Sequence, residues 1–296
     1  MSKIVILGNG YIGSKINKMF TEKFNINDVK HLYNYPYQNP AELKETLFQD
    51  IRQEFINTGT KWIVNCVGYT GSPNVDGCED NKQLTWDLNV TLPTLLAQFC
   101  SDQNIKLINI TSGCIYTDTN TPYEETDTPN FGIDSNDYGS QSSWYSKTKH
   151  ALELCLNGFT NVYNLRIRMP ICNDFNLSKN YLTKLLKYNN LLEEVNSKTV
   201  IEDLITVINK IITVEDIPTG TYNCVNPNPL TTKEVCGILD KYNLWNPHWK
   251  FINYEELQEH ITAQRSNCIL STEKSRLYNI EFPTEADSLH RLLQEK

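Results

Sequence analysis

The chain opens with Lys3-Ile-Val-Ile-Leu7, which runs directly into Gly8-Asn-Gly-Tyr-Ile-Gly13. An uninterrupted apolar run of this length is typical of a strand buried on both faces of a parallel sheet. The spacing of Ile12, Ile16 and Phe20 then predicts a helix. A G-x-G-x-x-G turn between a strand and a helix is the arrangement that binds dinucleotides. The N-terminus therefore predicts an α/β fold with a Rossmann-type, doubly wound parallel sheet.

Each glycine of this turn has a separate physical task. Gly8 allows the tight turn, Gly10 leaves room for a pyrophosphate, and Gly13 lets the helix pack on the strand. The helix N-terminus then faces the phosphates. The next buried strand, residues 62–67, ends at Gly68, where open α/β sheets bind their ligands. The predicted cofactor-binding residues are Gly8, Gly10, Tyr11, Ile12, Gly13, Asn65, Gly68, Tyr145 and Lys149.

The identity of the dinucleotide depends on the second strand, expected over residues 28–33. Folds that select NAD usually place an acidic residue about 20 residues beyond the glycines. This chain has His31-Leu-Tyr-Asn-Tyr35 there, without an acid that would repel a 2′-phosphate. We therefore expect NADPH, while NADH stays open because no arginine is evident. Candidate helpers for the phosphate are Ser14, Lys15, Lys30 and His31.

Strands and helices continue to alternate along the chain. Further strands are expected over residues 106–110, 162–168 and 220–225. Helices are expected over 41–55, 80–101, 145–156, 181–188, 200–212 and 284–293, with a Thr231/Glu234 capping box before another. The alternation is less regular after Pro170, which predicts a dinucleotide domain over 1–168 and a smaller substrate lobe over 169–296, with some elements returning to the main sheet. Residues 116–143 read as a long acidic loop, either a lid or a binding loop. Asp203 and Glu234 are expected to be solvated or capping.

Composition excludes several classes of function. The net charge of −8 argues against general attraction to nucleic acid. Nine scattered cysteines without a C-x-x-C pair indicate reduced thiols and no metal site. No apolar run reaches the roughly 18 residues of a membrane span. We therefore expect a cytoplasmic protein without a membrane segment.

Two segments carry candidate catalytic side chains. Tyr145 and Lys149 lie at positions i and i+4, so they share one helix face. A neighbouring ammonium should lower the phenol pKa from about 10 and ease proton exchange with a carbonyl oxygen. Ser112 lies at the end of a strand and would hydrogen-bond the same oxygen. The alternative interpretation of the Tyr145 and Lys149 spacing is an ordinary solvated helix face. Cys114, two residues further on, would by composition alone be a packed apolar thiol.

Several longer strings carry a family resemblance that covers nearly the whole chain. They are Gly71 to Asp76 (GSPNVD), Thr111 to Ile115 (TSGCI), Glu125 to Phe131 (ETDTPNF), Tyr145 to Lys149 (YSKTK), Leu165 to Ile171 (LRIRMPI), Asn180 to Lys184 (NYLTK) and Arg265 to Asn267 (RSN). With the glycine turn, they resemble the extended short-chain dehydrogenase/reductases. Within that family the chain is most similar to the rhamnose-forming nucleotide-sugar reductases and to the epimerase/reductases that make UDP-rhamnose.

The resemblance implies two reactions on a UDP-4-keto-6-deoxyhexose in one pocket. Cys114 as base and Lys184 as partner acid would invert C3 and C5. Hydride from the cofactor would then reduce C4, with Ser112, Tyr145 and Lys149 acting on the oxygen. Substrate contacts are expected from Asn74, Arg168, Asn180 and Arg265, with the two arginines on the pyrophosphate.

The resemblance also sets limits. Related fucose-forming enzymes use a histidine where Lys184 stands, and no histidine occurs between His150 and His248. A nucleotide-sugar 4,6-dehydratase must supply the substrate. A homodimer is compatible with the family, although the sequence leaves oligomeric state and the choice of UDP or dTDP open. Two alternatives remain: a dTDP-4-keto-rhamnose reductase without epimerase activity, and a non-catalytic NADP-binding regulatory subunit.

Overall fold

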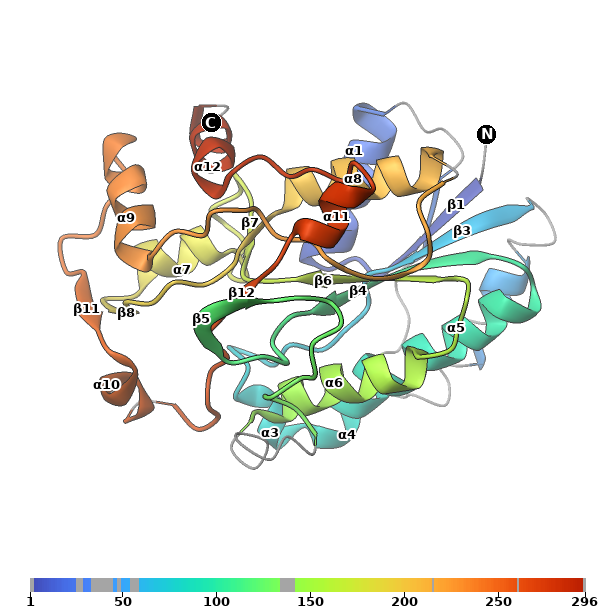
Figure 1. Cartoon of the computed structure of the whole chain (residues 1–296), viewed down its shortest axis with the longest axis horizontal. Coiled ribbons are helices and arrows are strands. Elements are labelled where there is room, and N and C mark those ends of the chain that lie inside the picture. The colour runs from blue at the N-terminus through green and yellow to red at the C-terminus, as the bar shows by residue number, and fades with distance from the viewer. Residues whose placement is uncertain are drawn as a thin grey trace.

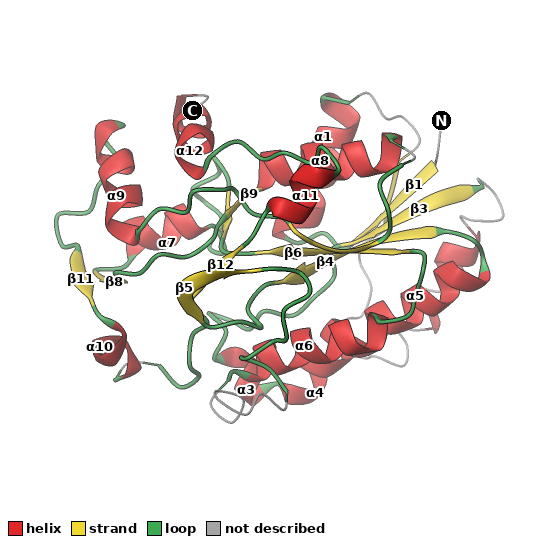
Figure 2. Ribbon diagram, viewed as in Figure 1, coloured by secondary structure: helices red, strands yellow, loops and turns green. Residues whose placement is uncertain are grey.

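A central parallel sheet with helices on both faces forms the frame of the molecule (Figures 1 and 2). The computed structural model describes residues 3–24, 29–32, 45–46, 49–53, 59–133, 142–214, 216–259 and 261–294. Within these residues the sheet has six strands in the order β10-β6-β4-β3-β1-β2. They are β1 (Lys3–Leu7), β2 (Val29–Leu32), β3 (Thr60–Asn65), β4 (Lys106–Ser112), β6 (Val162–Ile167) and β10 (Gly220–Asn223). All pair in parallel, so the predicted Rossmann-type fold is confirmed.

The strand order reverses at β1, which has β2 on one side and β3 on the other. Leu7 is in register with Asn65, so the glycine turn and the exit of β3 lie next to each other. The carboxyl ends of such diverging strands form a crevice where open α/β sheets bind ligands. The topology therefore places the predicted cofactor turn at the expected edge of the sheet.

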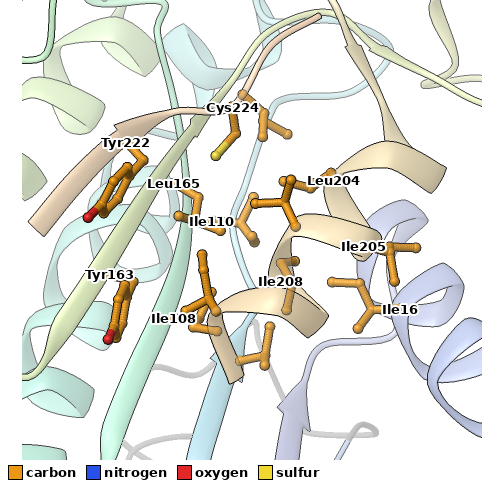
Figure 3. Packing of buried hydrophobic residues seen from close by; sticks show 14 of the residues in the cluster. Ile16, Ile108, Ile110, Tyr163, Leu165, Leu204, Ile205, Ile208, Tyr222 and Cys224 are labelled. Carbon is orange, nitrogen blue, oxygen red and sulfur yellow. The ribbon is translucent and has the colours of Figure 1, made fainter. Parts of the chain in front are cut away.

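One face of the sheet is covered by α1 (Tyr11–Glu22), α8 (Ile201–Thr213) and α11 (Glu273–Leu277), as Figure 1 shows. Side chains of α8 pack directly on the apolar side chains of the strands (Figure 3). Leu204, Ile205 and Ile208 are fully buried there against Ile108 and Leu165. The opposite face carries α5 (Leu92–Asp102) and α6 (Trp144–Leu156) over a second apolar cluster. Helix α6, which carries the predicted Tyr145 and Lys149 pair, is thus fixed by the core.

The single helix expected over residues 80–101 is wrong. The chain forms α3 (Gly77–Asp80), α4 (Lys82–Trp86), a π-helical turn η1 (Asp87–Thr91) and then α5. Asn81 breaks the first helix with φ −124° and ψ 51°. Pro93 lacks the N–H that would bond to Asn89, and its ring crowds that carbonyl, which favours the wider turn.

The segment 116–143 is more ordered than the expected loop in the part that the structure describes. β5 (Asp118–Tyr123) pairs in parallel with β12 (Cys268–Leu270), which comes from near the C-terminus. Tyr116 is fully buried, and its ring stacks on that of Tyr123 with centroids 4.4 Å apart. This portion is therefore scaffold, because it is tied to a distant strand and packed through two aromatic rings.

Later elements build a third apolar cluster beside the sheet. They include α7 (Tyr181–Lys187), α9 (Thr232–Lys241) and α12 (Glu285–Gln294), the pair β8 (Asn190–Leu192) with β11 (Lys250–Ile252), and the pair β7 (Pro170–Ile171) with β9 (Thr199–Val200). Helix α10 (Tyr254–Gln258) follows β11 and has no buried residue. In contrast, α8 and β10 join the main sheet. The domain boundary at residue 168 stays a prediction.

Two expectations about acidic residues had different outcomes. The capping box of Thr231 and Glu234 is confirmed at the start of α9. Asp203 was expected to be solvated or capping, and the solvated interpretation is wrong. It is 7% exposed and accepts hydrogen bonds from Asn226 and Ser288 besides an ion pair with Arg291. A buried carboxylate needs such partners, and they come from segments distant in the sequence.

Some predictions fall outside the described residues. Strand β2 confirms a strand within 28–33, but the side chains of His31 to Tyr35 are not described, nor is most of the expected helix 41–55. Among the described helices, none combines the length and apolar character needed to cross a membrane.

Candidate active site

Ser112 and Cys114 lie at the carboxyl end of β4, joined by a tight turn. The Cys114 backbone N–H donates to the Ser112 hydroxyl at 3.2 Å, and the Gly113 N–H donates to the Ile167 carbonyl at 3.1 Å. A Cβ on Gly113 would lie 3.2 Å from the Cδ of Arg168 and 2.5 Å from a methyl of Leu270. The lack of a side chain at Gly113 therefore lets Arg168 lie against the turn.

Tyr145 and Lys149 are positioned by α6, whose N-cap Ser143 accepts a hydrogen bond from the Ser146 N–H at 3.1 Å. The Lys149 amine lies 5.6 Å from the centre of the Tyr145 ring. Lys149 is only 5% exposed. Burial lowers the pKa of Lys149 to about 8, because the charged amine loses water. Its proton is therefore exchangeable close to neutral pH.

Tyr145 differs from the sequence prediction in its electrostatics. Burial raises its pKa, the charge of Cys114 acts in the same direction, and a hydrogen bond with Ser112 opposes both. The expected lowering by Lys149 is wrong for the chain as described, because desolvation of the phenolate outweighs nearby positive charge. Tyr145 is consequently a neutral phenol at physiological pH, the form that can donate a proton.

Cys114 is in contact with one cation and interacts electrostatically with two more. The Nη1 of Arg168, just after β6, lies 2.9 Å from its sulfur. The charge of Cys114 also acts on Lys149 of α6 and on Lys184 of α7. Burial lowers the pKa of Lys184, and the positive charges of Lys179 and Arg265 lower it further. Lys184 is thus a half-buried amine on the Cys114 side of α7.

The glycine turn has the geometry that a dinucleotide needs. Gly8 has φ +95°, in the left-handed region, and a Cβ on Gly13 would lie 2.0 Å from the Gly8 carbonyl oxygen. A Cβ on Gly10 would meet nothing within 4 Å, so space is open at that point. The N-cap Gly10 supplies no side-chain hydrogen bond, and the first turn of α1 has no acid. These N–H groups and the positive end of the helix dipole therefore suit a phosphate.

Gly68 brings the exit of β3 next to Lys149 of α6. A Cβ there would lie 3.2 Å from the Asn89 amide oxygen and 3.6 Å from the Lys149 amine. Asn89 is 1% exposed and bonds to both the N–H and the carbonyl of Tyr69, at 2.8 and 2.9 Å. It also donates to the Thr148 hydroxyl at 3.1 Å. The sequence analysis did not identify Asn89 as a residue that connects β3 with α6. The only indication in the sequence is its position four residues before Pro93.

Two predicted ligand contacts are scaffold residues in the structure. The Asn65 amide donates to Asn109 at 2.8 Å within a ladder across the sheet and accepts from the Val67 N–H at 3.1 Å. Asn180 is fully buried as the N-cap of α7, where its amide donates to the carbonyls of Cys172 and Asp174. Because their hydrogen bonds are used internally, both side chains position backbone in this structure, and their direct contact with a ligand stays a prediction.

The remaining predicted substrate contacts differ from one another. Asn74 accepts the Asp76 N–H at 2.8 Å and so shapes its own loop. Arg265 forms two 2.8 Å hydrogen bonds to the Asp76 carboxylate, and its side chain is 23% exposed. Its hydrogen bond holds the pKa of Asp76 below the usual range. Arg168 is 2% exposed with both terminal nitrogens bonded to protein atoms, an arrangement that disfavours its predicted pyrophosphate contact, which stays a prediction.

Similarity to a known protein family and to curated proteins extends over nearly the whole chain. The sequence model of the family described as "RmlD substrate binding domain" matches residues 2–295. An Arabidopsis thaliana bifunctional dTDP-4-dehydrorhamnose 3,5-epimerase/reductase is 35% identical over 222 residues, which is 75% of this chain and 71% of the relative. The A. thaliana trifunctional UDP-glucose 4,6-dehydratase/3,5-epimerase/reductase RHM1 is 33% identical over 284 residues. That match covers 95% of this chain and 40% of the longer relative.

Solved structures share the fold. The L780 UDP-rhamnose synthase of Acanthamoeba polyphaga mimivirus has a TM-score of 0.83 and 25% identity, with 99% of each chain covered. A dTDP-4-dehydrorhamnose reductase from Bacillus anthracis in complex with NADP has a TM-score of 0.78 and 18% identity, with 100% of this chain and 99% of the other covered.

Proposed function

Because the chain belongs to the RmlD substrate binding domain family, we propose that it is a nucleotide-sugar 4-reductase that also inverts C3 and C5. The proposed substrate is UDP-4-keto-6-deoxyglucose and the product is UDP-L-rhamnose. One observation carries the proposal: Cys114 lies two residues after Ser112 at the end of β4, and its charge acts on Tyr145, Lys149 and Lys184. Relatives named as reductases and epimerases of rhamnose synthesis support it.

The proposed cofactor is NADPH, which supplies hydride to C4 when bound. The open space at Gly10 and the uncapped start of α1 support this assignment, as does the bound NADP of the B. anthracis relative. Lys149, held beside Gly68, would hold the cofactor ribose. Arg265 is the remaining proposed contact to the substrate pyrophosphate, in competition with Asp76.

Reduction needs a proton at the substrate oxygen O4 as hydride arrives at C4. Tyr145 is a neutral phenol and donates that proton, while the Ser112 hydroxyl hydrogen-bonds the same oxygen. The positive charge of Lys149 stabilises the phenolate that Tyr145 becomes when the phenol proton leaves. Because the pKa of Lys149 is about 8, the Lys149 ammonium can then pass a proton to this phenolate. These three residues therefore suffice for the reductive half of the proposal.

Epimerisation uses the acidity that the 4-keto group confers on C3–H and C5–H. The Cys114 thiolate accepts a proton from carbon and becomes a thiol, leaving an enolate whose oxygen is held by Ser112 and Tyr145. The Lys184 ammonium then returns a proton to the opposite face and becomes an amine. Transfer of the thiol proton to this amine through solvent restores both groups. The same sequence at the second carbon completes the inversion.

The experiment incubates the purified chain with UDP-4-keto-6-deoxyglucose and NADPH in D2O. We expect NADPH oxidation, formation of UDP-rhamnose, and deuterium at C3 and C5 by NMR and mass spectrometry. Absence of NADPH oxidation with this ketone and with the pre-epimerised ketone would contradict the whole proposal and favour a non-catalytic subunit. Reduction of the pre-epimerised ketone without deuterium incorporation into the first substrate would leave a reductase alone.

The supply of substrate is part of the same proposal. A 4-keto-6-deoxy sugar arises by loss of water from C5 and C6 with oxidation at C4, which is 4,6-dehydratase chemistry. The trifunctional A. thaliana relatives include that activity in their names, and this chain spans 40% of the length of RHM1. We therefore propose that a separate dehydratase activity feeds this site.

A further inference from the structure

Arg168 is a buried cation whose charge has no carboxylate partner among the described residues. Among the residues that the structure describes, Arg168 has the largest fully buried side chain. Its Nη1 donates to the Cys114 sulfur at 2.9 Å and to the Ser266 hydroxyl at 2.8 Å. Its Nη2 donates to the Ser266 carbonyl at 3.0 Å and to the Asn196 amide oxygen. Cys114 is therefore its only hydrogen-bond partner that can become an anion.

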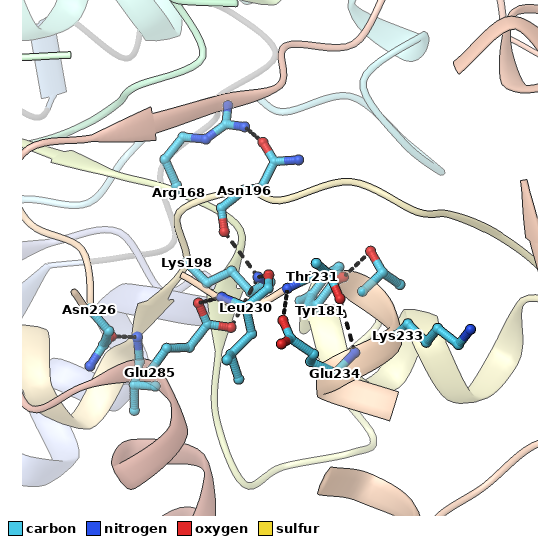
Figure 4. Close-up of polar contacts among 12 residues, drawn as sticks. Arg168, Tyr181, Asn196, Lys198, Asn226, Leu230, Thr231, Lys233, Glu234 and Glu285 are labelled. Carbon is cyan, nitrogen blue, oxygen red and sulfur yellow. Dashed lines mark hydrogen bonds and ion pairs between the residues drawn. The ribbon is translucent and has the colours of Figure 1, made fainter. Parts of the chain in front are cut away.

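The orientation of this guanidinium is fixed by its surroundings. Figure 4 shows Arg168 facing Asn196, whose carbonyl accepts from Lys198 at 2.9 Å. Lys198 is itself paired with Glu285 at 3.0 Å. The Arg168 backbone N–H is held by the Thr199 hydroxyl at 3.1 Å. Arg168 therefore cannot turn toward solvent without breaking several contacts.

Arg166, two residues earlier, shows what is unusual about Arg168. Arg166 is 3% exposed, and its guanidinium lies 2.6 and 2.8 Å from the two carboxylate oxygens of Glu153. A buried charge normally needs such a partner. Cys268 is near Arg168 but fully buried, and burial raises its pKa, so it stays a thiol. Tyr145 also interacts electrostatically with Arg168, but burial raises its pKa and keeps it a neutral phenol, so Cys114 is left as the group that can balance the charge of Arg168.

We infer that Arg168 is a positioning residue that holds the sulfur of Cys114 and stabilises its negative charge when it acts as a base. The role in catalysis rests on the proposed epimerase function, whereas the contact with the thiol does not. An arginine stays protonated throughout, so it takes no proton from the substrate. It aligns the thiolate and then remains bonded to the neutral thiol after the proton has moved from carbon to sulfur.

The test that needs no substrate measures alkylation of Cys114 by iodoacetamide at pH 7, followed by peptide mass mapping. In Arg168→Gln we expect the Cys114 rate to fall about tenfold, the effect of losing one charge-assisted hydrogen bond. The exposed thiol of Cys155 serves as a reference within the same molecule, and its rate should not change. Arg168→Lys keeps a charge and should give an intermediate rate. A Cys114 rate equal to wild type in Arg168→Gln overturns the inference.

A second readout connects the contact to turnover. Arg168→Gln should lose C3 and C5 deuterium exchange on the order of 100-fold, the scale of a lost proton-transfer group. Reduction of the pre-epimerised ketone should stay within about threefold, because Arg168 bonds none of the reduction residues. Equal losses in both reactions would indicate a merely structural role and overturn the inference. If wild type itself shows no exchange, the epimerase proposal fails, while the alkylation result still decides the thiol contact.

Controls cover folding. Arg276→Gln alters an exposed arginine of α11 paired with Glu273, and should change neither readout. If Arg168→Gln does not fold, as judged by circular dichroism, Ser266→Ala replaces it, because it removes one support of Nη1 while leaving the arginine. We expect Cys114 alkylation to slow about threefold there, a smaller share of one hydrogen bond. An unchanged rate in that variant would count against the inference.

Discussion

The reduction residues and the cluster around Cys114 lie at one strand end but are assembled differently. Ser112, Tyr145 and Lys149 come from one strand and one helix of the main sheet. Cys114 is bonded by Arg168, which Ser266 supports in turn, and its charge acts on Lys184, so three further segments contribute to its surroundings. The proposed reduction set therefore needs only the packing of one helix on the main sheet, whereas the chemistry at the thiol depends on how the C-terminal elements pack.

The largest effect is expected at Tyr145, which belongs to the proposed reduction set and not to the cluster around Cys114. Tyr145→Phe removes the proton donor, so reduction of the pre-epimerised ketone should fall by roughly 10²–10⁴-fold. NADPH binding, followed by fluorescence, should stay close to wild type. Tyr145→Phe activity within tenfold of wild type would show that another group protonates O4 and would remove the distinction between the two sets.

The next largest effect is expected at Cys114, where a substitution should impair epimerisation and spare reduction. Cys114→Ser should reduce C3 and C5 deuterium exchange by at least on the order of 100-fold, because an alcohol is a far weaker source of an anion than a thiol. Reduction of the pre-epimerised ketone should remain within a few-fold. Cys155→Ser, at an exposed thiol of the same helix as Tyr145, is the matched control. Undiminished exchange in Cys114→Ser would exclude the thiol from the mechanism.

A pH profile sharpens the comparison further. The pKa of Lys149 is lowered to about 8 by burial, so its ammonium is present below that pH and lost above it. Reduction of the pre-epimerised ketone should therefore fall as pH rises through 8, about tenfold per pH unit well above it. Lys149→Arg keeps its charge and should move the fall to higher pH. A flat profile from pH 7 to 10 in the wild type would contradict this role of Lys149.

The smallest expected effect concerns the glycine turn that is proposed to bind the cofactor. This turn lies at the same edge of the sheet as the residues of both reactions. A Cβ at Gly10 meets nothing within 4 Å, so Gly10→Ala should leave Tm within about 2 °C, the scale of a surface substitution. It should weaken NADPH about tenfold, because the methyl occupies the approach to the phosphates. Gly13→Ala is the contrast, since its Cβ would meet the Gly8 carbonyl at 2.0 Å and should lower Tm. Unchanged NADPH affinity in Gly10→Ala would move the phosphates elsewhere.

Much of the fold could be predicted because short spacings determine it. The strand, glycine turn and helix at residues 3–22 formed as expected, as did α6 with its i, i+4 pair. The predictions for residues 80–101 and 116–143 failed for different reasons, one local and one non-local. Pro93 and Asn81 broke a helix that apolar spacing favoured, and β5 needed a partner strand about 150 residues away.

The sequence by itself therefore determined the sheet, the cofactor turn and the pairing of Tyr145 with Lys149, because helix and strand periodicity place residues that are near in sequence. Only the tertiary structure decided that Asn180 caps a helix, that burial raises the pKa of Tyr145, and that Arg168 bonds the sulfur of Cys114. Desolvation and charge pairing depend on which distant segments meet, and no local spacing encodes that meeting. For this reason the carbonyl chemistry could be predicted from residue order, while the surroundings of the thiol could not.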